Sequence, residues 1–296
     1  MTPRAATGTV LVEFWGMASG IAAYNYAVRL NWQAPTSALI PALERILELP
    51  GRKFYTVAVT IWRAALLVYS AIDVRFLESA KKQQRFALSL TDAEVSDGVK
   101  SFKQFPGLVE SLTSRKAIVR YQIHSVERTL ASLTAMGEHV YWPSPDDTRK
   151  EIDRIAAPGL CDSIFVLWPQ RNLFDGSLVP SAGWGLGMAA CSWSNGATYA
   201  VVGNAESSVW QIPIVGEVWL HEWLHGVCAY FRDLGYRMPD GDADGGARHG
   251  YVQSQASGWT EYYRDLMSGN VRDEGAKTGV PLDAWRLPPC SARLAG

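Results

Sequence analysis

The sequence predicts an α+β fold, in which several β-strands precede a long amphipathic helix and a loop-rich C-terminal part. Short apolar runs bounded by glycine or proline predict strands at residues 162–169 and 198–202. The stretch 218–231, VWLHEWLHGVCAYF, instead repeats its apolar residues at helical spacing. After Gly235, glycine and aspartate become frequent and the regular patterns end.

The remaining elements follow in chain order. Thr91 is a candidate N-cap, and Glu94 three residues later completes a capping-box pattern, so a helix is expected to begin at residue 92. Its apolar face contains Val95, Val99 and Phe102. We expect this helix to stop at Pro106 and Gly107, because proline removes a backbone donor and clashes with the preceding turn.

Residues 117–126 predict a half-buried strand, and residues 162–169 a central one. The run 198–202 predicts a further strand, for which an edge position is open. The core-facing stripe of the long helix consists of Leu220, Leu224, Val227 and Phe231. Residues 259–267 predict a short final helix.

Charge and composition restrict the class of protein. The chain of 296 residues has a formal net charge of -1, and no basic run is longer than Lys81 and Lys82, so nucleic acid is not an expected partner. Only 19% of residues are charged, beside 12 tryptophans and 12 tyrosines, which favours a secreted or extracellular protein. No signal peptide is visible, because Glu13 interrupts the first apolar run. One disulfide, between Cys161 and Cys191, is left open.

The long helix carries His221 and His225 four residues apart, with Glu222 directly after the first. Two imidazoles at this spacing project from one helix face and can reach one zinc ion at about 2.0–2.1 Å. Glu222 lies one residue round the helix, where a carboxylate can accept a proton from water without ligating the metal. A buried helix with two hydrogen-bonded histidines is the alternative. The motif follows three predicted strands on an amphipathic helix, and this position favours the metal site.

The pattern His221-Glu222-Trp223-Leu224-His225 resembles the zincin superfamily of zinc metallopeptidases, and the resemblance covers about 180 residues, 91 to 270. It implies a zincin-like fold, with a mixed β-sheet lobe over an active-site helix and a smaller loop-rich lobe. It also implies that the two histidines ligate Zn²⁺ and that the glutamate is the catalytic base.

The resemblance suggests a division into domains. We expect a catalytic domain over residues 91–296, with an upper lobe to about residue 232 and a C-terminal lobe over residues 233–296. Residues 1–90 show no decisive period, and we expect them to pack on this domain without assigning them a role. Within them, residues 54–72 have the length of a membrane helix, but Arg63 at the centre costs about 2.5–3.5 kcal/mol on insertion, so no stable membrane insertion is expected.

Two branches of the superfamily differ from this sequence after the motif. The metzincins place a third histidine where Phe231 stands, although Asp265-Leu266-Met267 resembles their methionine turn. A single methionine is also ordinary core packing. The gluzincins take their third ligand from a later helical glutamate, and Glu261, with an aspartate four residues on, fits that pattern.

The third zinc ligand has three candidates, in the order His249, Glu261 and Asp244. His249 lies in a glycine-flanked loop 24 residues after His225, and an imidazole there completes a common set of three protein ligands and water. A loop histidine without a role is the alternative. If His249 is the ligand, Tyr251 in the same loop is a candidate donor to the oxyanion.

The same region contains a candidate calcium site. Asp240, Asp242 and Asp244 alternate, with Gly245 at the sixth position, like the opening of a calcium loop. A full EF-hand is excluded, because Tyr251 stands at the twelfth position, where that loop requires glutamate. Ca²⁺ bound by the three aspartates and a solvated acidic turn are both left open.

The predicted function is that of a zinc-dependent hydrolase, with a metallopeptidase acting on a peptide or protein substrate as the first candidate. A zinc hydrolase for an ester or glycosidic bond is an alternative. Another is a carbohydrate- or surface-binding protein with a non-catalytic metal, because tryptophan rings stack on sugars. The tryptophans considered for that role are Trp184, Trp193, Trp210, Trp219 and Trp223.

Overall fold

The computed structural model describes residues 8–17, 23–32, 53–56, 60–79, 82–206, 209–210, 214–287 and 289–290. The chain divides into two compact units, Met1–Ile61 and Trp62–Gly296. In the first unit, the strands β1 (Gly8–Met17), β2 (Ala23–Trp32) and β3 (Lys53–Thr56) form an antiparallel sheet in the order β2, β1, β3. Residues 62–90, assigned from sequence to the N-terminal region, thus belong to the second unit.

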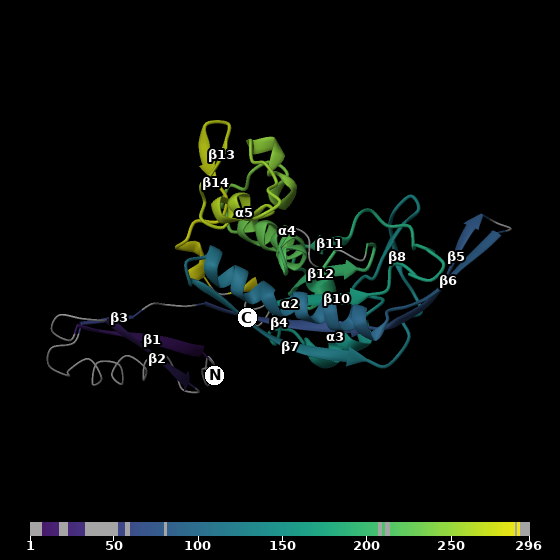
Figure 1. Cartoon of the computed structure of the whole chain (residues 1–296), viewed down its shortest axis with the longest axis horizontal. Coiled ribbons are helices and arrows are strands. Elements are labelled where there is room, and N and C mark those ends of the chain that lie inside the picture. The colour runs from purple at the N-terminus through teal and green to yellow at the C-terminus, as the bar shows by residue number, and fades with distance from the viewer. Residues whose placement is uncertain are drawn as a thin grey trace. The chain divides into compact units, whose positions relative to one another are not determined.

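A five-stranded mixed sheet forms the centre of the second unit (Figure 1). Its strands are β4 (Thr60–Tyr69), β7 (Ala117–Val126), β10 (Ser163–Trp168), β11 (Gly185–Met188) and β12 (Thr198–Gly203). They follow the order β11, β12, β10, β4, β7, in which β10 is parallel to β12 and β4, and β11 is antiparallel to β12. The three predicted strands are confirmed as β7, β10 and β12. Since β12 has neighbours on both sides, the edge strand beside it is β11.

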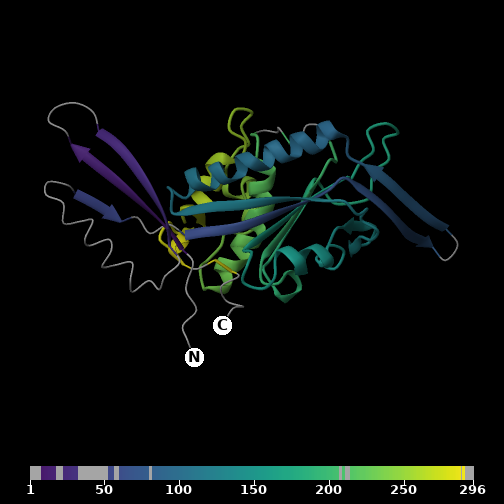
Figure 2. The same ribbon diagram turned by 90° about the horizontal axis from the view of Figure 1, so that it is seen from below.

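Helices cover both faces of this sheet. The described part of the second unit contains α2 (Asp92–Leu112), α3 (Arg149–Ile155), α4 (Glu217–Asp233) and α5 (Thr260–Leu266). In β4, alternate residues from Trp62 to Val68 pack into one apolar cluster with α2 and α4, while those from Ala65 to Tyr69 pack into another with α3. Because successive side chains of a strand point to opposite faces, α2 and α4 cover one face and α3 the other. Figure 2 shows α2 and α3 on opposite sides of the strands.

Helix α2 begins as predicted and ends later than predicted. The Thr91 hydroxyl accepts the Glu94 N–H at 3.2 Å, and the Glu94 carboxylate accepts the Thr91 N–H at 2.8 Å, which completes the capping box. The predicted stop at Pro106 is wrong. Proline costs a helix interior about 3 kcal/mol. Phe105 and Val109 are fully buried, however, and each such burial contributes about 1.5–3 kcal/mol, so packing carries the helix past the proline.

Residues 60–69 of the apolar stretch around Arg63 form strand β4. Arg63 Nε lies 3.1 Å from the carboxylate of Asp162, whose side chain is fully buried at the start of β10. No helix among the described residues is long and apolar enough to cross a membrane.

The disulfide left open by the sequence is not formed, because Cys161 and Cys191 are both free thiols. Cys161 is buried, and its sulfur donates to the carbonyl oxygen of Ser163 at 3.0 Å. Burial raises the pKa of the Cys161 thiol to about 12, so this cysteine stays protonated at neutral pH. Cys191 is exposed.

The part of the chain after α4 carries the predicted short helix, α5, and little other regular structure. It contains the 3₁₀ turns η2 (Asp242–Asp244), η3 (Ala247–His249) and η4 (Ala284–Arg286), and the hairpin β13 (Val271–Asp273) to β14 (Ala276–Thr278). Two further hairpins precede α4, formed by β5 (Ala71–Ser79) with β6 (Lys82–Ser89) and by β8 (Thr134–Gly137) with β9 (Val140–Trp142). The buried face of α5 packs on the same apolar cluster as α4.

Candidate metal centre

Helix α4 lies directly against strand β11, and glycines make this approach possible. A Cβ atom on Gly187 would overlap the backbone carbonyl oxygen of Glu222, and one on Gly185 would lie 2.5 Å from the Glu222 carboxyl carbon. On the helix side, a Cβ on Gly226 would lie 2.6 Å from the carbonyl oxygen of Met188. A larger side chain at Gly187 or Gly226 would meet backbone and push the strand away from the helix, whereas one at Gly185 would meet the Glu222 carboxylate.

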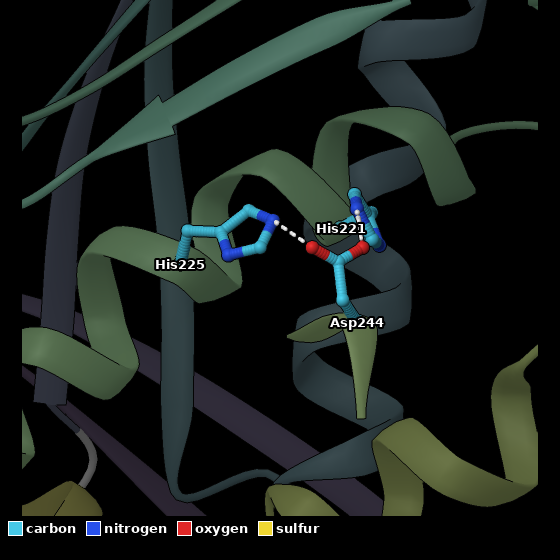
Figure 3. A group of neighbouring side chains, drawn as sticks. All are labelled: His221, His225 and Asp244. Carbon is cyan, nitrogen blue, oxygen red and sulfur yellow. Dashed lines mark ion pairs between the residues drawn. The ribbon is translucent and has the colours of Figure 1, made fainter. Parts of the chain in front are cut away.

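Two imidazoles and a carboxylate converge beside α4. His221 Nε2 lies 3.3 Å from Asp244 Oδ1, and His225 Nε2 lies 3.7 Å from Asp244 Oδ2 (Figure 3). The three ligand atoms all lie within 4.8 Å of one another, which is close enough for one metal ion. The histidines come from consecutive turns of α4, and the aspartate comes from the turn η2.

Each imidazole is also held at its other nitrogen. His225 Nδ1 lies 2.7 Å from Asp242 Oδ1, and His221 Nδ1 lies 2.8 Å from the Tyr263 hydroxyl oxygen. With Nε2 free for a metal, each Nδ1–H donates to its partner, so both rings are fixed in the tautomer and orientation that a ligand needs. Histidines that ligate metals regularly show such a partner.

The charges of the site favour a cation. The hydrogen bond from His221 lowers the pKa of Asp244. Burial opposes ionisation of His225, but the hydrogen bond to Asp242 and the nearby carboxylates outweigh it and raise the pKa of that imidazole. Burial raises the pKa of Asp242, but the hydrogen bond from His225, the Ala243 N–H and the charge of Arg232 outweigh it and lower that pKa. The negative charge of these carboxylates favours a proton on the imidazole, and for the same reason it favours a divalent cation bound at the position of that proton.

Glu222 lies beside the histidines with its side chain almost fully buried, at 6% exposure. Burial raises its pKa, as expected for a carboxylate taken out of water. It borders a cavity of about 560 Å³ together with both histidines and Asp244. A buried carboxylate with a raised pKa, next to a candidate metal centre, has the properties of a general base or acid.

The other two candidates for third ligand lie outside this group. His249 Nε2 lies 2.9 Å from the carbonyl oxygen of Asp240, and Glu261 is exposed on α5. Among the described residues, the structure brings Asp244 together with His221 and His225 in a group that could hold a metal, and neither His249 nor Glu261 belongs to that group. Tyr251 is also directed elsewhere, because its hydroxyl donates to Asp265 Oδ2 at 2.5 Å.

The three alternating aspartates do not converge on a calcium site in this structure. Asp240 pairs with Arg248 at 2.8 Å, Asp242 contacts His225, and Asp244 contacts both histidines of α4. No group of these three aspartates within metal-binding distance occurs among the described residues. Asp244 instead belongs to the group that could hold a metal, and Asp242 contacts the Nδ1 atom of His225.

Sequence reasoning missed Tyr263 and the role of Asp242. Helical periodicity contained a signal for the tyrosine, because the apolar residues of α5 repeat at helical spacing. These buried residues are Tyr262, Tyr263, Leu266 and Met267. That register turns Tyr263 towards α4 and leaves Glu261 in solvent. The contact of Asp242 with His225 had no signal, because it depends on how a turn docks on a distant helix.

The tryptophan-rich surface considered from sequence is largely absent. Trp210, Trp219 and Trp223 are at most 3% exposed and pack in the core, where they cannot stack on a ligand. Trp184 and Trp193 are only partly buried. Comparisons of the chain with protein-family models, with curated proteins and with solved structures found no match.

Proposed function

We propose that this protein is a zinc-dependent hydrolase, and specifically a metallopeptidase, with His221, His225 and Asp244 as the zinc ligands and Glu222 as the general base. The observation that carries the proposal is that three ligand atoms lie within 4.8 Å of one another. The Nδ1 atom of each imidazole is in addition hydrogen-bonded, to Tyr263 or to Asp242. Two imidazoles and one carboxylate match the nitrogen and oxygen ligands of catalytic zinc sites, which keep a further position open. The side chains therefore fit the metal expected from the sequence.

His221, His225 and Asp244 would hold a zinc ion, which when bound would supply a Lewis acid to polarise a substrate carbonyl and to lower the pKa of water. The Glu222 carboxylate then accepts a proton from the attacking water and returns it to the leaving nitrogen. Its place beside both histidines on the wall of the pocket suits both steps, because a group that accepts and then donates a proton must lie within reach of the reacting atoms.

Tyr263 has two roles in this proposal. Its hydroxyl oxygen accepts the Nδ1–H of His221, which leaves the hydroxyl hydrogen free to point into the pocket that Tyr263 borders. A hydroxyl in that place can donate to the oxygen that gains negative charge during attack on a carbonyl. We assign this donor role to Tyr263 in place of Tyr251.

The preference for a peptide substrate rests on strand β11. It is one of the two edge strands of the five-stranded sheet, and Gly185, Leu186 and Gly187 from it border the pocket. An extended peptide can pair with the open edge of such a strand through its backbone. The scissile carbonyl would then lie next to α4. A mixed sheet above a His-Glu-x-x-His helix is also the arrangement that the zincin resemblance implies.

Metal content and turnover together test the proposal. Protein purified without chelators should contain about one equivalent of zinc and should cleave members of a peptide library, with cleavage abolished by a chelator and restored by zinc. The variant Glu222→Gln should keep the zinc and lose most of the cleavage, because the amide cannot accept the proton. A protein that binds no zinc after reconstitution, or a Glu222→Gln variant with wild-type turnover, would contradict the proposal.

A further inference from the structure

A second buried carboxylate, Glu217, borders the pocket outside the metal centre. It is the first residue of α4, one helical turn before His221, and it is 4% exposed. Its Oε1 accepts the backbone N–H of Trp259 at 3.0 Å. Its Oε2 is buried and has no hydrogen-bond partner in the described part of the chain. A buried carboxylate oxygen without a partner is costly to the fold, so its presence calls for an explanation.

A structural role explains only half of this side chain. The bond from Trp259 to Oε1 connects the start of α5 with the start of α4, and a neutral acceptor such as glutamine would make the same bond. The second oxygen contributes nothing to that connection. Burial raises the pKa of Glu217, which shows that the surrounding side chains provide too little positive charge to compensate for lost water.

The pocket as a whole is acidic. Three carboxylates border it, those of Glu217, Glu222 and Asp244, and the described lining residues include no lysine or arginine. A divalent metal ion brings two positive charges against these three negative ones when all are ionised. With all three ionised, the pocket is therefore negative even beside a bound divalent metal, and a ligand that carries a positive charge would compensate the remaining charge and favour the ionised carboxylates.

The walls near Glu217 suit a cation on an apolar stem. Val218 follows it on α4, Trp259 donates to it, and both border the pocket with Trp184. Aliphatic chains pack on such side chains, and the faces of tryptophan rings attract cations. An ammonium or guanidinium group carries N–H donors, which are the groups that the unpaired oxygen requires.

We propose that Glu217 determines specificity by binding a positively charged nitrogen of the substrate with its carboxylate, from the wall of the pocket. The cation is either the α-ammonium at the N-terminus of a peptide or the end of a lysine or arginine side chain, and the chemistry of recognition is the same for both. This inference rests on the proposed function where it calls the ligand a substrate. Binding of a cation in the pocket does not require turnover and is tested separately.

Two pairs of small amides measure the binding of the charge alone. Leucinamide and 4-methylpentanamide differ by an α-ammonium, and Nα-acetyl-lysinamide and Nα-acetylnorleucinamide differ by a side-chain ammonium. Trp184 and Trp259 border the pocket, so tryptophan fluorescence should report binding to the whole protein, with and without zinc. In at least one pair, the cation should bind about tenfold or more tightly than its neutral mate.

The pair that shows this preference identifies the source of the cation, and variants identify the carboxylate. Glu217→Gln keeps the acceptor for Trp259 and should bind both members of the pair equally. The control Glu138→Gln, in an exposed turn that does not border the pocket, should keep the preference. Equal affinities in both pairs for the wild-type protein would overturn the proposal whether or not any variant folds. A preference that persists in Glu217→Gln would also overturn it.

These outcomes are separate from the fate of the peptidase proposal. A cation preference that depends on Glu217 in a protein without turnover would leave this inference standing and contradict the proposed function. Peptide cleavage without any preference for a basic residue or a free N-terminus, together with equal affinities in both amide pairs, would do the reverse.

Discussion

The two sides of the candidate metal centre are built in different ways. The His221 and His225 side chains are 25% and 22% exposed, on a helix that packs against the sheet and α2. The Asp244 side chain opposite them is 67% exposed and belongs to a single 3₁₀ turn. Helical spacing alone places the two histidines side by side on α4. The position of Asp244 instead depends on how the turn η2 packs against α4.

Contacts from both neighbouring helices hold that turn. Gly241 before it has φ of 81°, a conformation that favours glycine. The Asp242 carboxylate contacts His225 of α4, and the Asp242 carbonyl oxygen accepts a hydrogen bond from the Tyr262 hydroxyl of α5. The exposed ligand is thus fixed through its backbone and through the residue two positions before it, and not by burial of its own side chain.

The largest effect on zinc affinity should come from replacing a histidine of α4. Replacing His225 by alanine removes a ligand and also leaves the partly buried Asp242 carboxylate without its imidazole partner. We expect zinc affinity to fall by more than the 10–100-fold that loss of a ligand's hydrogen-bond partner costs. Competition with a chromophoric chelator measures this affinity. The control His139→Ala, in an exposed turn, should bind zinc normally, and zinc binding by His225→Ala at wild-type affinity would refute the assignment.

Substitutions in the part of the chain after α4 should have the next largest effect on zinc binding, and they distinguish the three candidates for the third ligand. Asp244→Ala should lose most zinc retention, because two imidazoles remain and the chelate is weakened. His249→Ala and Glu261→Ala should retain zinc, since both side chains lie outside the group. Metal analysis after dialysis compares the three variants. Loss of zinc from His249→Ala with retention in Asp244→Ala would restore the order expected from sequence.

Removing the groups that are hydrogen-bonded to the Nδ1 atoms of the imidazoles should have an intermediate effect on zinc affinity. Tyr263→Phe removes the hydroxyl that holds His221, and Asp242→Asn removes the charge beside His225. Each should lower zinc affinity by about 10–100-fold with the fold intact. Tyr251→Phe is the matched control, because this hydroxyl contacts Asp265 on the same short helix and no imidazole. A Tyr263→Phe variant no weaker than that control would remove the tyrosine from the site.

The smallest effect should be on the pH dependence of stability, and it concerns the ion pair between Arg128 and Glu151. Arg128 lies 2.6 Å from Glu151, which also accepts the Tyr69 hydroxyl at 2.6 Å. Burial opposes ionisation, but these hydrogen bonds outweigh it and lower the pKa of Glu151. The folded state therefore binds the proton less readily than the unfolded state. This stability is present above the ordinary glutamate pKa of about 4.3 and is lost as pH falls through the lowered value.

Denaturant unfolding between neutral and acidic pH measures that loss. Glu151→Gln should be less stable than the wild type at neutral pH and should show a shallower decline below about pH 4.3. Identical slopes for the two proteins would mean that Glu151 titrates alike in the folded and unfolded states.

The sequence predicted what depends on neighbours along the chain. The spacing of His221 and His225, the capping box of α2 and the strands β7, β10 and β12 were all readable, because each is a local pattern. Strand β11 was missed, since its glycines serve contact with α4 and have no strand propensity of their own. Asp244 was placed last among the ligands, because its meeting with α4 depends on tertiary packing that leaves no periodic signal.

If α4 and the turn η2 together hold one zinc ion, anomalous diffraction at the zinc absorption edge will locate it between them. Crystals of the zinc-loaded protein should show one strong peak bonded to His221 Nε2, His225 Nε2 and a carboxylate oxygen of Asp244, with Zn–N and Zn–O distances of about 2.0–2.2 Å. The absence of a peak between these three side chains, or a peak completed by His249 or Glu261 in place of Asp244, would contradict the account.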